Sequence, residues 1–290
     1  SRLTCQPYNV LRRGPGQKVI GISLYGKGQM FYKNLKGTQR IVKEKFPDWI
    51  MRIYHDDTID FDAKCDLECS KDDRTGAYLN NLDFCFVNKL PTMHSSEPAW
   101  KGSATWSAKY LHGMKWRWLP IGESFVDLFM SRDSDAIFTE REHRAVQQWL
   151  NASTILHAMR DHPYHNVPML GGLWGLAVKL NRAHAQIIYQ KIVSSNDQTA
   201  SVNANKKGED QTFLHFEVFP PFLDRQKNYT IHTSFFCNAF GETTQPFPEP
   251  REGSCYVGTN VRECASTSRD DLLKCPDSCK PNLTEQWLYC

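Results

Sequence analysis

The chain has 290 residues, enough for one large domain or two small ones. Hydrophobic residues make up 40% of the sequence, so the chain can bury a real core and global disorder is excluded. The formal net charge of +3 is close to neutral for this length, and no run of basic residues is interleaved with aromatic ones, which argues against nucleic-acid binding.

The N-terminal part of the chain predicts a linker followed by a strand–helix–strand unit. Residues 1–17 include the sequence RRGPG and are interpreted as a stem or linker. The apolar run at residues 18–24 (KVIGISL) predicts a buried strand, residues 30–46 carry apolar side chains at helical spacing, and residues 49–54 (WIMRIY) predict a second strand. Such a unit predicts a parallel sheet with a nucleotide-type crevice at the carboxyl ends of its strands.

The middle of the chain predicts a central strand that ends in an acidic turn. Residues 56–104 show no regular pattern, and residues 106–119 are compatible with a helix that carries Arg117. Residues 124–130 (SFVDLFM) are apolar and rich in strand formers, so they predict a central strand. The sequence Ser131-Arg-Asp-Ser-Asp135 follows that strand directly.

Helices and strands continue to alternate in the second half of the chain. The sequence TERE, from Thr139 to Glu142, has the form of a capping box and predicts a helix start. The predicted elements are a helix at 140–150, a strand at 154–159, a glycine-bearing loop at 169–175 (MLGGLWG), a helix at 180–193 and a further apolar stretch at 212–219. We therefore expect one domain over residues 18–250 and a cysteine-rich C-terminal extension over residues 251–290.

Cysteine usage indicates an oxidising compartment. The chain has ten cysteines, and five lie in its last 36 residues: Cys255, Cys264, Cys275, Cys279 and Cys290. An even total with a dense tail predicts disulfides, and the glycosylation sequons at Asn151, Asn228 and Asn282 fit the same address. The alternative is zinc binding by the Cys65/Cys69 and Cys275/Cys279 pairs, whose three-residue spacing is less typical of zinc sites.

No stretch of the sequence is apolar over the ~18–20 residues needed to cross a bilayer, and no signal peptide is visible. A membrane anchor that is missing from the N-terminal side of this chain stays an open alternative. We expect the protein in the lumen of the secretory pathway, in the Golgi or secreted. The oligomeric state is left open.

The acidic turn after the central strand carries the chemical argument. The carboxylates of Asp133 and Asp135, at positions i and i+2 past a strand, can both reach one hard divalent cation that bridges the phosphates of a nucleotide diphosphate. The same spacing recurs at Asp60 and Asp62, but without an apolar strand in front of it. The position after a strand therefore favours Asp133 and Asp135, because ligands of open α/β sheets bind where the strands end. The competing interpretation is a solvated acidic turn or helix cap.

Several short motifs, taken as a set, resemble a family of GT-A glycosyltransferases with relatives in animals, bacteria and large DNA viruses. The motifs are Ile22-Ser-Leu-Tyr-Gly26, Phe46-Pro-Asp-Trp49, Arg52-Ile-Tyr54, Arg132-Asp-Ser-Asp135, Arg141-Glu142, Ala145-Val146, Trp149-Leu150, Met159-Arg-Asp-His-Pro163 and Leu170-Gly-Gly-Leu-Trp-Gly175. The resemblance covers residues 18–250 and leaves residues 251–290 unmatched. It implies an α/β fold: a Rossmann-like GT-A glycosyltransferase domain with a mixed, mostly parallel sheet, followed by a short disulfide-rich C-terminal tail.

The resemblance also implies a metal centre and a donor site. Asp135 is the expected main metal ligand, Asp133 is expected to bind the donor ribose or a metal-bound water, and His232 is the candidate third ligand. An imidazole ligand suits Mn²⁺ better than Mg²⁺, so manganese is the expected cofactor and magnesium the alternative. For His232 the competing interpretation is an ordinary buried or surface histidine. The residues expected around the nucleotide sugar are Ser23, Leu24, Tyr25, Arg117, Arg132 and Ser134.

For the acceptor side, the resemblance implies that Asp210 is the general base that deprotonates the attacking hydroxyl. The competing interpretation of Asp210 is an acid at a helix N-terminus. The residues expected to contact substrate are Arg160, Asp161, His162, Gly171, Gly172 and Trp174. The glycines are equally compatible with a tight turn, and Trp174 with a core position.

The resulting prediction is a metal-dependent glycosyltransferase. It would move a sugar from a nucleotide sugar, expected to be a UDP-sugar, to a hydroxyl of a glycan or glycoprotein. The alternative from another class is a secreted carbohydrate-binding pseudoenzyme or lectin on the same fold. A hydrolase of nucleotide sugars is a third alternative. Two departures from the family pattern, Lys27 and Ala136, leave the donor sugar unassigned.

Overall fold

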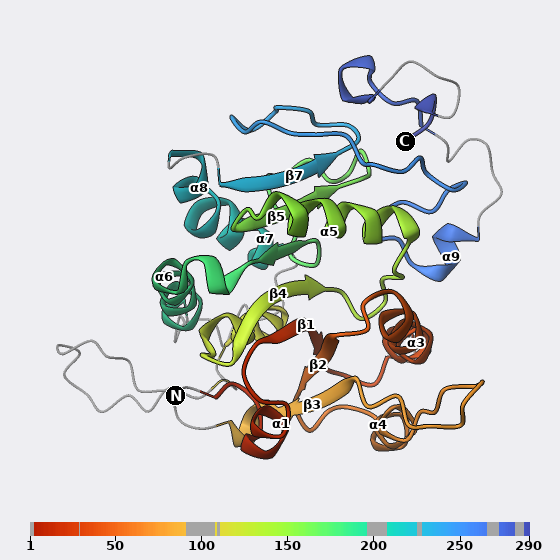
Figure 1. Ribbon diagram of the computed structural model, residues 1–290, viewed down its shortest axis with the longest axis vertical. Coiled ribbons are helices and arrows are strands. Elements are labelled where there is room, and N and C mark those ends of the chain that lie inside the picture. Colours follow the sequence, from red (N-terminus) through yellow and green to blue (C-terminus); the bar gives the residue numbers. More distant parts are fainter. Residues whose placement is uncertain are drawn as a thin grey trace.

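A computed structural model of the protein describes residues 3–28, 30–90, 108, 111–195, 208–224, 228–265, 273–281 and 287–290. Within these residues the chain forms a seven-stranded sheet in the order β3-β2-β1-β4-β6-β5-β7. The strands are β1 (Gln17–Leu24), β2 (Trp49–His55), β3 (Leu82–Phe86), β4 (Val126–Arg132), β5 (Leu156–Arg160), β6 (Trp174–Leu176) and β7 (Tyr229–Thr233). The pairs β1–β2, β1–β4, β2–β3 and β5–β7 are parallel, whereas β6 is antiparallel to both β4 and β5. The predicted mixed, mostly parallel α/β sheet is confirmed (Figure 1).

Helices cover both faces of this sheet. The α-helices are α1 (Pro7–Leu11), α2 (Met30–Lys33), α3 (Leu35–Lys45), α4 (Phe61–Glu68), α5 (Glu140–Ala152), α6 (Arg182–Ser194), α7 (Glu209–Phe213), α8 (Pro220–Asp224) and α9 (Val261–Cys264). The 3-10 helices are η1 (Val87–Lys89), η3 (Gly113–Gly122), η4 (Val178–Leu180) and η8 (Asp277–Cys279), and η6 (Leu214–Val218) is a π-helix.

Alternating side chains along the strands build two cores. On β4, Leu128 and Met130 pack with α3 and α5, whereas Phe129 between them packs with η3, α6 and η6. The predicted central strand therefore lies in the middle of the sheet and is buried on both faces. Its carboxyl end opens onto the same edge as the carboxyl ends of β1, β5 and β7.

The structure confirms most predicted elements and corrects three expectations. Residues 56–104 are not all irregular, because they contain α4 and β3, which are too short to give a clear period in the sequence. The helix expected over residues 106–119 is instead the 3-10 helix η3, and residues 106, 107, 109 and 110 lie outside the described part. Pro120 within η3 has no N–H to donate, which opposes a regular α-helix. The short strands β6 and β7 were not predicted.

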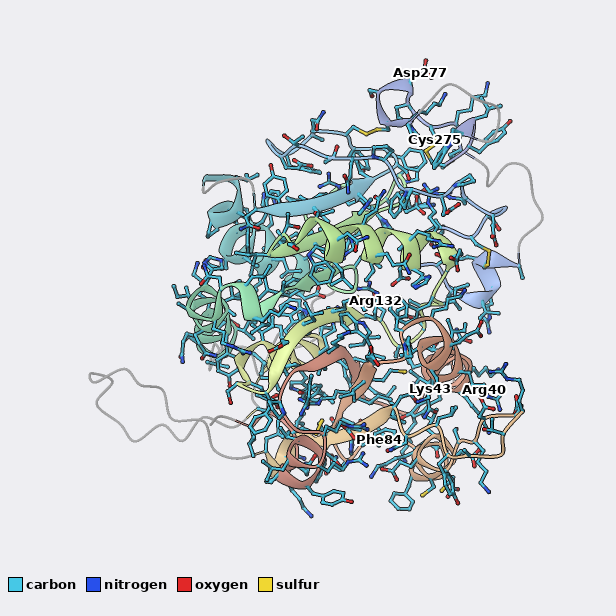
Figure 2. The ribbon with its side chains drawn as sticks, in the orientation of Figure 1. Arg40, Lys43, Phe84, Arg132, Cys275 and Asp277 are labelled. Atoms are coloured by element: carbon cyan, nitrogen blue, oxygen red, sulfur yellow. A yellow bond between two sulfur atoms is a disulfide. The ribbon has the colours of Figure 1, made fainter. Side chains whose placement is uncertain are left out.

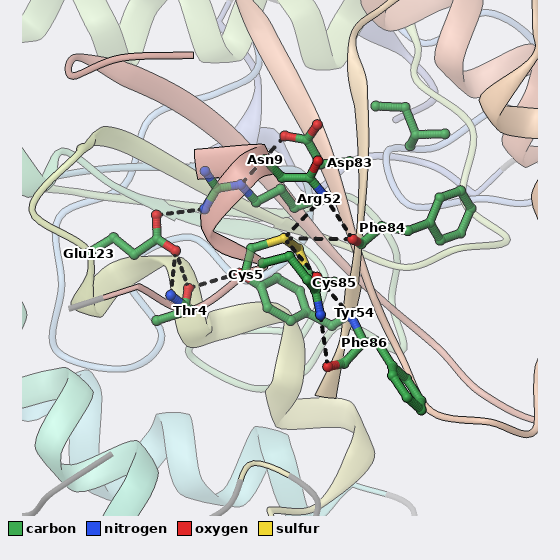
Figure 3. Close-up of a disulfide and its surroundings, with 12 residues drawn as sticks. Thr4, Cys5, Asn9, Arg52, Tyr54, Asp83, Phe84, Cys85, Phe86 and Glu123 are labelled. Atoms are coloured by element: carbon green, nitrogen blue, oxygen red, sulfur yellow. Dashed lines mark hydrogen bonds and ion pairs between the residues drawn. A yellow bond between two sulfur atoms is a disulfide. The ribbon is translucent and has the colours of Figure 1, made fainter. Parts of the chain in front are cut away.

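The described part of the expected linker packs on the domain. Helix α1 buries Val10, and Cys5 forms a disulfide with Cys85 of β3. Figure 3 shows this disulfide beside Arg52, whose guanidinium donates to Glu123 Oε2 over 2.7 Å. Burial lowers the pKa of Arg52 and the Glu123 carboxylate raises it, and the pKa is raised overall, so the guanidinium stays charged. A free stem would expose these side chains, so this segment belongs to the folded domain.

Four disulfides confirm the oxidised character of the described cysteines: Cys5–Cys85, Cys237–Cys279, Cys255–Cys264 and Cys275–Cys290. The zinc alternative for Cys275 and Cys279 is wrong, because each is bonded to a different cysteine. Cys65 and Cys69 are free thiols on α4. Figure 2 places Cys275 at the opposite end of the molecule from Phe84 of β3.

Three further features bear on where in the cell the protein is located. The Asn151 side chain is exposed near the end of α5, whereas the Oδ1 atom of Asn228 accepts a hydrogen bond from Ile155 N–H over 2.8 Å. Asn282 lies outside the described residues. Among the helices of the described chain, none has the length and apolarity of a membrane span. The four disulfides fit a secreted or lumenal protein.

Candidate functional site

A cavity of about 600 Å³ lies at the edge of the sheet where β1 and β4 end. Its walls include the turns after β1 and β4, part of η3, the residues after β5, the loop before β6, the start of α7 and the C-terminal extension. The predicted site residues that line it are Ser23, Leu24, Tyr25, Arg117, Asp133, Ser134, Asp135, Gly171, Gly172 and Asp210. Side chains that are far apart in the sequence therefore meet at the crevice that the sheet topology predicts.

The two aspartates of the acidic turn both face this cavity. Asp133 is the first residue after β4 and its side chain is 49% exposed, whereas Asp135 is half-buried. Burial first, and then the nearby Asp133 carboxylate, raise the pKa of Asp135 above its usual value. A cation bound beside Asp135 and Asp133 would offset their negative charge and would be stabilised by it. The other Asp-any-Asp sequence has a structural role, because Asp60 caps α4 by accepting from Ala63 N–H over 3.0 Å.

Arg117 connects the acidic turn to the predicted base. Its guanidinium pairs with Asp133 through Nη1 and with Asp210 Oδ2 through Nη2 over 2.9 Å. The Arg117 side chain is 5% exposed and the Asp210 side chain 4% exposed, so this part of the cluster is shielded from water. Arg117 was expected beside the nucleotide sugar, but in this structure two carboxylate partners use both of its terminal nitrogens. Its role in this structure is to hold Asp133 and Asp210 in place.

Close packing of the backbone places Arg117. The Arg117 backbone N–H donates to Ser23 Oγ over 3.0 Å, which ties η3 to the end of β1. The Arg117 carbonyl oxygen lies so close to Gly21 of β1 that a Cβ atom at Gly21 would overlap it. Gly21 is therefore required for η3 to approach the sheet.

The two glycines of the loop before β6 form the floor beneath the charged cluster. A Cβ atom at Gly171 would overlap the Asp210 carboxylate and Arg117 Nη2, and a Cβ atom at Gly172 would overlap the Asp133 carboxylate. This arrangement follows from strand register, because Ser131 of β4 is paired with Trp174 of β6. In an antiparallel pair, the residue two positions after Ser131 lies opposite the residue two positions before Trp174. Both glycines are therefore required by the close approach of these carboxylates, and their part in substrate binding stays a prediction.

The chemistry of the donor set fits a divalent cation that is shared with a ligand. Asp133 and Asp135 supply hard carboxylate oxygens, and magnesium sites commonly use one or two carboxylates with the remaining ligands coming from phosphate and water. No group of three or more His, Cys, Asp or Glu side chains suited to a metal occurs within the described residues. The described residues therefore contribute two carboxylates at this place, those of Asp133 and Asp135.

His232 is not brought to this cavity. It lies in β7, where its Nδ1 contacts His157 Nε2 over 3.1 Å and its Nε2 contacts Gln148 Oε1 and Gln245 Nε2, each over 2.9 Å. Burial lowers its pKa to about 3, so the ring is neutral, but both nitrogens are already engaged. The expected third metal ligand is therefore wrong for this arrangement. The preference for manganese over magnesium, which depended on an imidazole ligand, therefore loses its support.

Two predicted contact residues are instead part of the core. Arg132 points away from Asp133, since neighbouring residues of a strand face opposite sides, and its Nε donates to Glu142 of α5. Figure 2 shows Arg132 in the interior between β4 and α5. Trp174 is fully buried and makes edge-to-face contacts with Trp118 and Phe129 at 5.8 and 5.2 Å between ring centroids. A sugar cannot reach either side chain, so these two expectations are corrected.

The sequence after β5 was expected to contact substrate, but its first residues form a buried anchor. Arg160 pairs with Glu242, and Asp161 pairs with Arg141 over 3.0 Å. Asp161 Oδ2 also accepts from Val257 N–H over 2.8 Å, so this carboxylate holds the C-terminal extension. Burial opposes ionisation of Asp161, but the guanidiniums of Arg141 and Arg251 hold its pKa below the usual value. Arg160 and Asp161 are thus structural.

His162 lies behind the cavity wall, whereas Tyr164 and His165 line the cavity. Asp161 N–H donates to His165 Nδ1 over 3.0 Å, and burial lowers the pKa of His165 to about 4, so the ring is neutral at physiological pH. His165 was not among the predicted site residues, and in the structure it lies in the cavity wall.

Several further residues line the cavity that the sequence did not single out as site residues. They are Phe31, Met114, Tyr164, Leu170, Leu173, Gly208, Gln211, Tyr256, Gly258, Asn260 and Glu263. Leu170 and Leu173 lie within a quoted motif, whereas four of the others belong to the extension that we had separated from the domain. The sequence predicts disulfides in that extension, but neither their pairing nor where the extension docks.

Comparison with known proteins does not assign the chain to a family. No family model matches the chain, and no curated protein matches it. Among solved structures, the chain is similar to the crystal structure of a glycosyltransferase involved in the glycosylation of the major capsid of PBCV-1. The identity is 13%, the match covers 76% of this chain and 82% of that chain, and the TM-score is 0.39. At this level the likeness assigns neither a family nor an activity, so a functional conclusion depends on the residues of the cavity.

Proposed function

We propose that the protein is a metal-dependent glycosyltransferase that uses a nucleotide sugar, with a UDP-sugar as the first candidate donor. The observation that carries this proposal is the cluster of Asp133, Asp135 and Asp210 around Arg117 in one cavity at the ends of β1 and β4. A simple carbohydrate-binding protein has no need for two partly exposed carboxylates in the wall of one cavity. A nucleotide diphosphate with its cation does need them.

The walls of the cavity suggest how such a donor is placed. The turn Ser23–Tyr25 offers a surface for the nucleotide, with the Tyr25 ring held edge-on to Trp116 at 5.6 Å between centroids. Asp133 and Asp135, at the neighbouring strand end, would hold the cation that binds the diphosphate. Bound there, a Mg²⁺ or Mn²⁺ ion supplies Lewis-acid stabilisation of the charge on the departing diphosphate. Gly171 and Gly172 leave room for the carboxylates of Asp210 and Asp133, which face the cavity.

Asp210 is the candidate for the group that acts on the acceptor. It lines the cavity from the start of α7 and is paired with Arg117. In the proposed reaction the acceptor oxygen bonds to the anomeric carbon while the bond from that carbon to the diphosphate breaks. The electron pair leaves with the nucleotide diphosphate, and the hydroxyl proton passes to the Asp210 carboxylate. The acceptor is a hydroxyl of a glycan or glycoprotein.

The test is release of nucleotide diphosphate from a panel of nucleotide sugars in the presence of Mg²⁺ or Mn²⁺. We expect release from at least one donor, its loss in chelator, and its loss in the Asp135→Ala variant. Asp62→Ala is the matched control, because it removes one carboxylate of the second Asp-any-Asp sequence from an exposed position on α4. A fully active Asp135→Ala protein would overturn the site assignment.

The same experiment separates the enzyme from its alternative. A secreted pseudoenzyme or lectin on this fold would bind sugars without releasing any nucleotide diphosphate, and UDP with a cation would leave its thermal stability unchanged. For the enzyme, UDP and cation together should raise the unfolding temperature, and either one alone should raise it less. A location in the Golgi is part of the proposal and is tested by microscopy of the tagged full-length protein.

A further inference from the structure

The C-terminal extension forms one wall of the cavity, although no part of the donor argument uses it. Tyr256, Gly258, Asn260 and Glu263 all line the cavity. They belong to the segment that the Cys255–Cys264 disulfide closes into a loop, which we call the clasp loop (residues 255–264). A wall that the donor does not need is available to a second substrate.

The clasp loop is fixed directly beside the acidic turn. Asn260 forms an isolated antiparallel bridge with Ala136, the residue after Asp135, and Ile137 N–H donates to Thr259 O over 2.9 Å. Asp161 holds the other end of the loop through the Val257 N–H. Attachment at both ends, together with the disulfide, makes this wall a preorganised surface rather than a loosely held tail.

Aromatic rings gather where the clasp loop meets the residues after β5. The Tyr256 ring lies 4.4 Å from the His162 ring and 5.7 Å from the His165 ring, and Tyr164 contacts His162 at 5.1 Å between centroids. Tyr164 is 85% exposed, the largest exposed fraction among the bulky hydrophobic side chains of the described chain. Tyr164 therefore presents an exposed ring in the cavity wall, where a bound ligand would cover its apolar surface.

Polar groups border these rings. The Tyr256 hydroxyl donates to Glu263 Oε2 over 2.5 Å, and the Asn260 side chain lies on the same wall. A flat apolar ring bordered by fixed hydrogen-bonding groups matches the chemistry of a pyranose, which has an apolar C–H face and a rim of hydroxyls. A Ser or Thr side chain of an extended peptide would offer no such face.

The order of the strands separates this surface from the donor side. The nucleotide surface lies at the end of β1 and the acidic turn at the end of β4, next to β1, whereas Tyr164 and His165 follow β5, two places further along the sheet. The aromatic cluster is therefore on the far side of the acidic turn from the nucleotide surface, where the acceptor of a transfer reaction has to enter.

We propose that the clasp loop, with Tyr164 and His165, is a binding site for a pyranose ring of a glycan acceptor. The inference rests on the proposed function only in calling the bound glycan an acceptor. Binding of a pyranose can be measured whether or not any transfer occurs. Tyr164 and Tyr256 would supply ring contacts, and Asn260 and Glu263 hydrogen bonds to hydroxyls. The specificity for the acceptor would then lie in the segment that has no counterpart in the family resemblance.

The experiment is saturation-transfer-difference NMR on the intact protein with UDP and Mg²⁺ present. The probes are the methyl pyranosides of glucose, galactose, mannose and N-acetylglucosamine, and a Ser/Thr-containing peptide is the competing probe. We expect transfer to the ring C–H protons of at least one pyranoside. Tyr164→Ala should weaken its binding by about tenfold, the order expected for losing one ring-stacking contact. Tyr8→Ala is the control, because Tyr8 is 74% exposed on α1 and does not line the cavity.

The outcomes separate this inference from the proposed function. Pyranoside binding that Tyr164→Ala weakens, in a protein that binds no UDP, would leave the sugar site standing and overturn the transferase. UDP binding with saturation transfer to the peptide alone, or to no probe, would overturn the sugar site and leave the donor site intact. Equal pyranoside binding by Tyr164→Ala and wild-type protein would also overturn it, and because Tyr164 is exposed, misfolding does not obscure that result.

Discussion

Replacing Arg117 by Met should destabilise the protein mainly by stranding Asp210. Arg117 and Asp210 have side chains that are 5% and 4% exposed, so the carboxylate left behind would be a buried charge without a partner. Breaking such a buried pair from one side costs about 3–5 kcal/mol. The contribution of Asp133 is smaller, about 0–1 kcal/mol, because its side chain is 49% exposed and water screens the pair. We expect a total loss of about 3–5 kcal/mol.

A double-mutant cycle tests this reasoning. In an Asp210→Asn background the same Arg117→Met change no longer strands a buried carboxylate, so its cost should fall to about 1–2 kcal/mol. The free energy of unfolding is measured by urea denaturation at pH 7, with far-UV circular dichroism as the probe and the slope m compared among variants. If the two substitutions are additive within about 0.5 kcal/mol, the pair is not energetically coupled and the argument fails.

Three further predictions concern the acidic turn, the glycine floor and the clasp loop. Because the pKa of Asp135 is raised in the folded state, its protonation stabilises the native state at pH values below the unfolded-state pKa. This stabilisation is lost as the pH rises through the folded-state pKa. Asp135→Asn should therefore raise the urea midpoint of the metal-free protein at pH 7, while it removes the magnesium-dependent part of UDP binding in calorimetry. Gly172→Ala would force the flexible Asp133 carboxylate aside, so it should cost less than about 1.5 kcal/mol of stability and still weaken UDP binding. Replacing Cys255 and Cys264 by Ser opens a loop whose ends are 9 residues apart, so it should cost about 2.6 kcal/mol and weaken pyranoside binding more than UDP binding.

Matched variants give each of these predictions a control. Gly37→Ala on α3 places its Cβ where no atom lies within 4 Å, so it should leave UDP binding unchanged. Replacing Cys275 and Cys290 opens a loop of similar size, 15 residues, away from the cavity, and should lower stability without affecting pyranoside binding. An Asp135→Asn protein that is less stable than wild type at pH 7 would contradict the assigned electrostatics, and unchanged UDP binding by Gly172→Ala would remove the glycine floor from the site.

Local pattern was enough to predict the parts of the site that lie next to regular elements. The apolar run before Asp133 predicted a central strand, and the end of a central strand is where a ligand binds in such a sheet. The same reasoning set aside Asp60 and Asp62, of which Asp60 proved to be a helix cap. Both interpretations depend on residues that are neighbours in the sequence, so periodicity and position sufficed.

Local pattern failed where the direction of a side chain decides its role. Arg132 and Asp133 are adjacent, but the alternation of a strand sends one into the core and the other into the cavity. His232 looked suitable as a ligand, yet its strand β7 is an edge strand of the sheet, beyond β5, and its ring belongs to a buried network. Trp174 could not be assigned to core or site until the pairing of β6 was known.

The α/β class, an oxidising compartment and the acidic turn at the end of β4 could be predicted from the composition, the hydrophobic period and the nearest neighbours in the sequence. The ion pairs of Arg117 with both Asp133 and Asp210, and the place of the clasp loop in the cavity wall, could be seen only in the tertiary structure. Residues separated by 93 positions, as Arg117 and Asp210 are, meet only because strand order and register fold the chain back on itself. That information is carried by packing across the whole domain, which no short stretch of sequence contains.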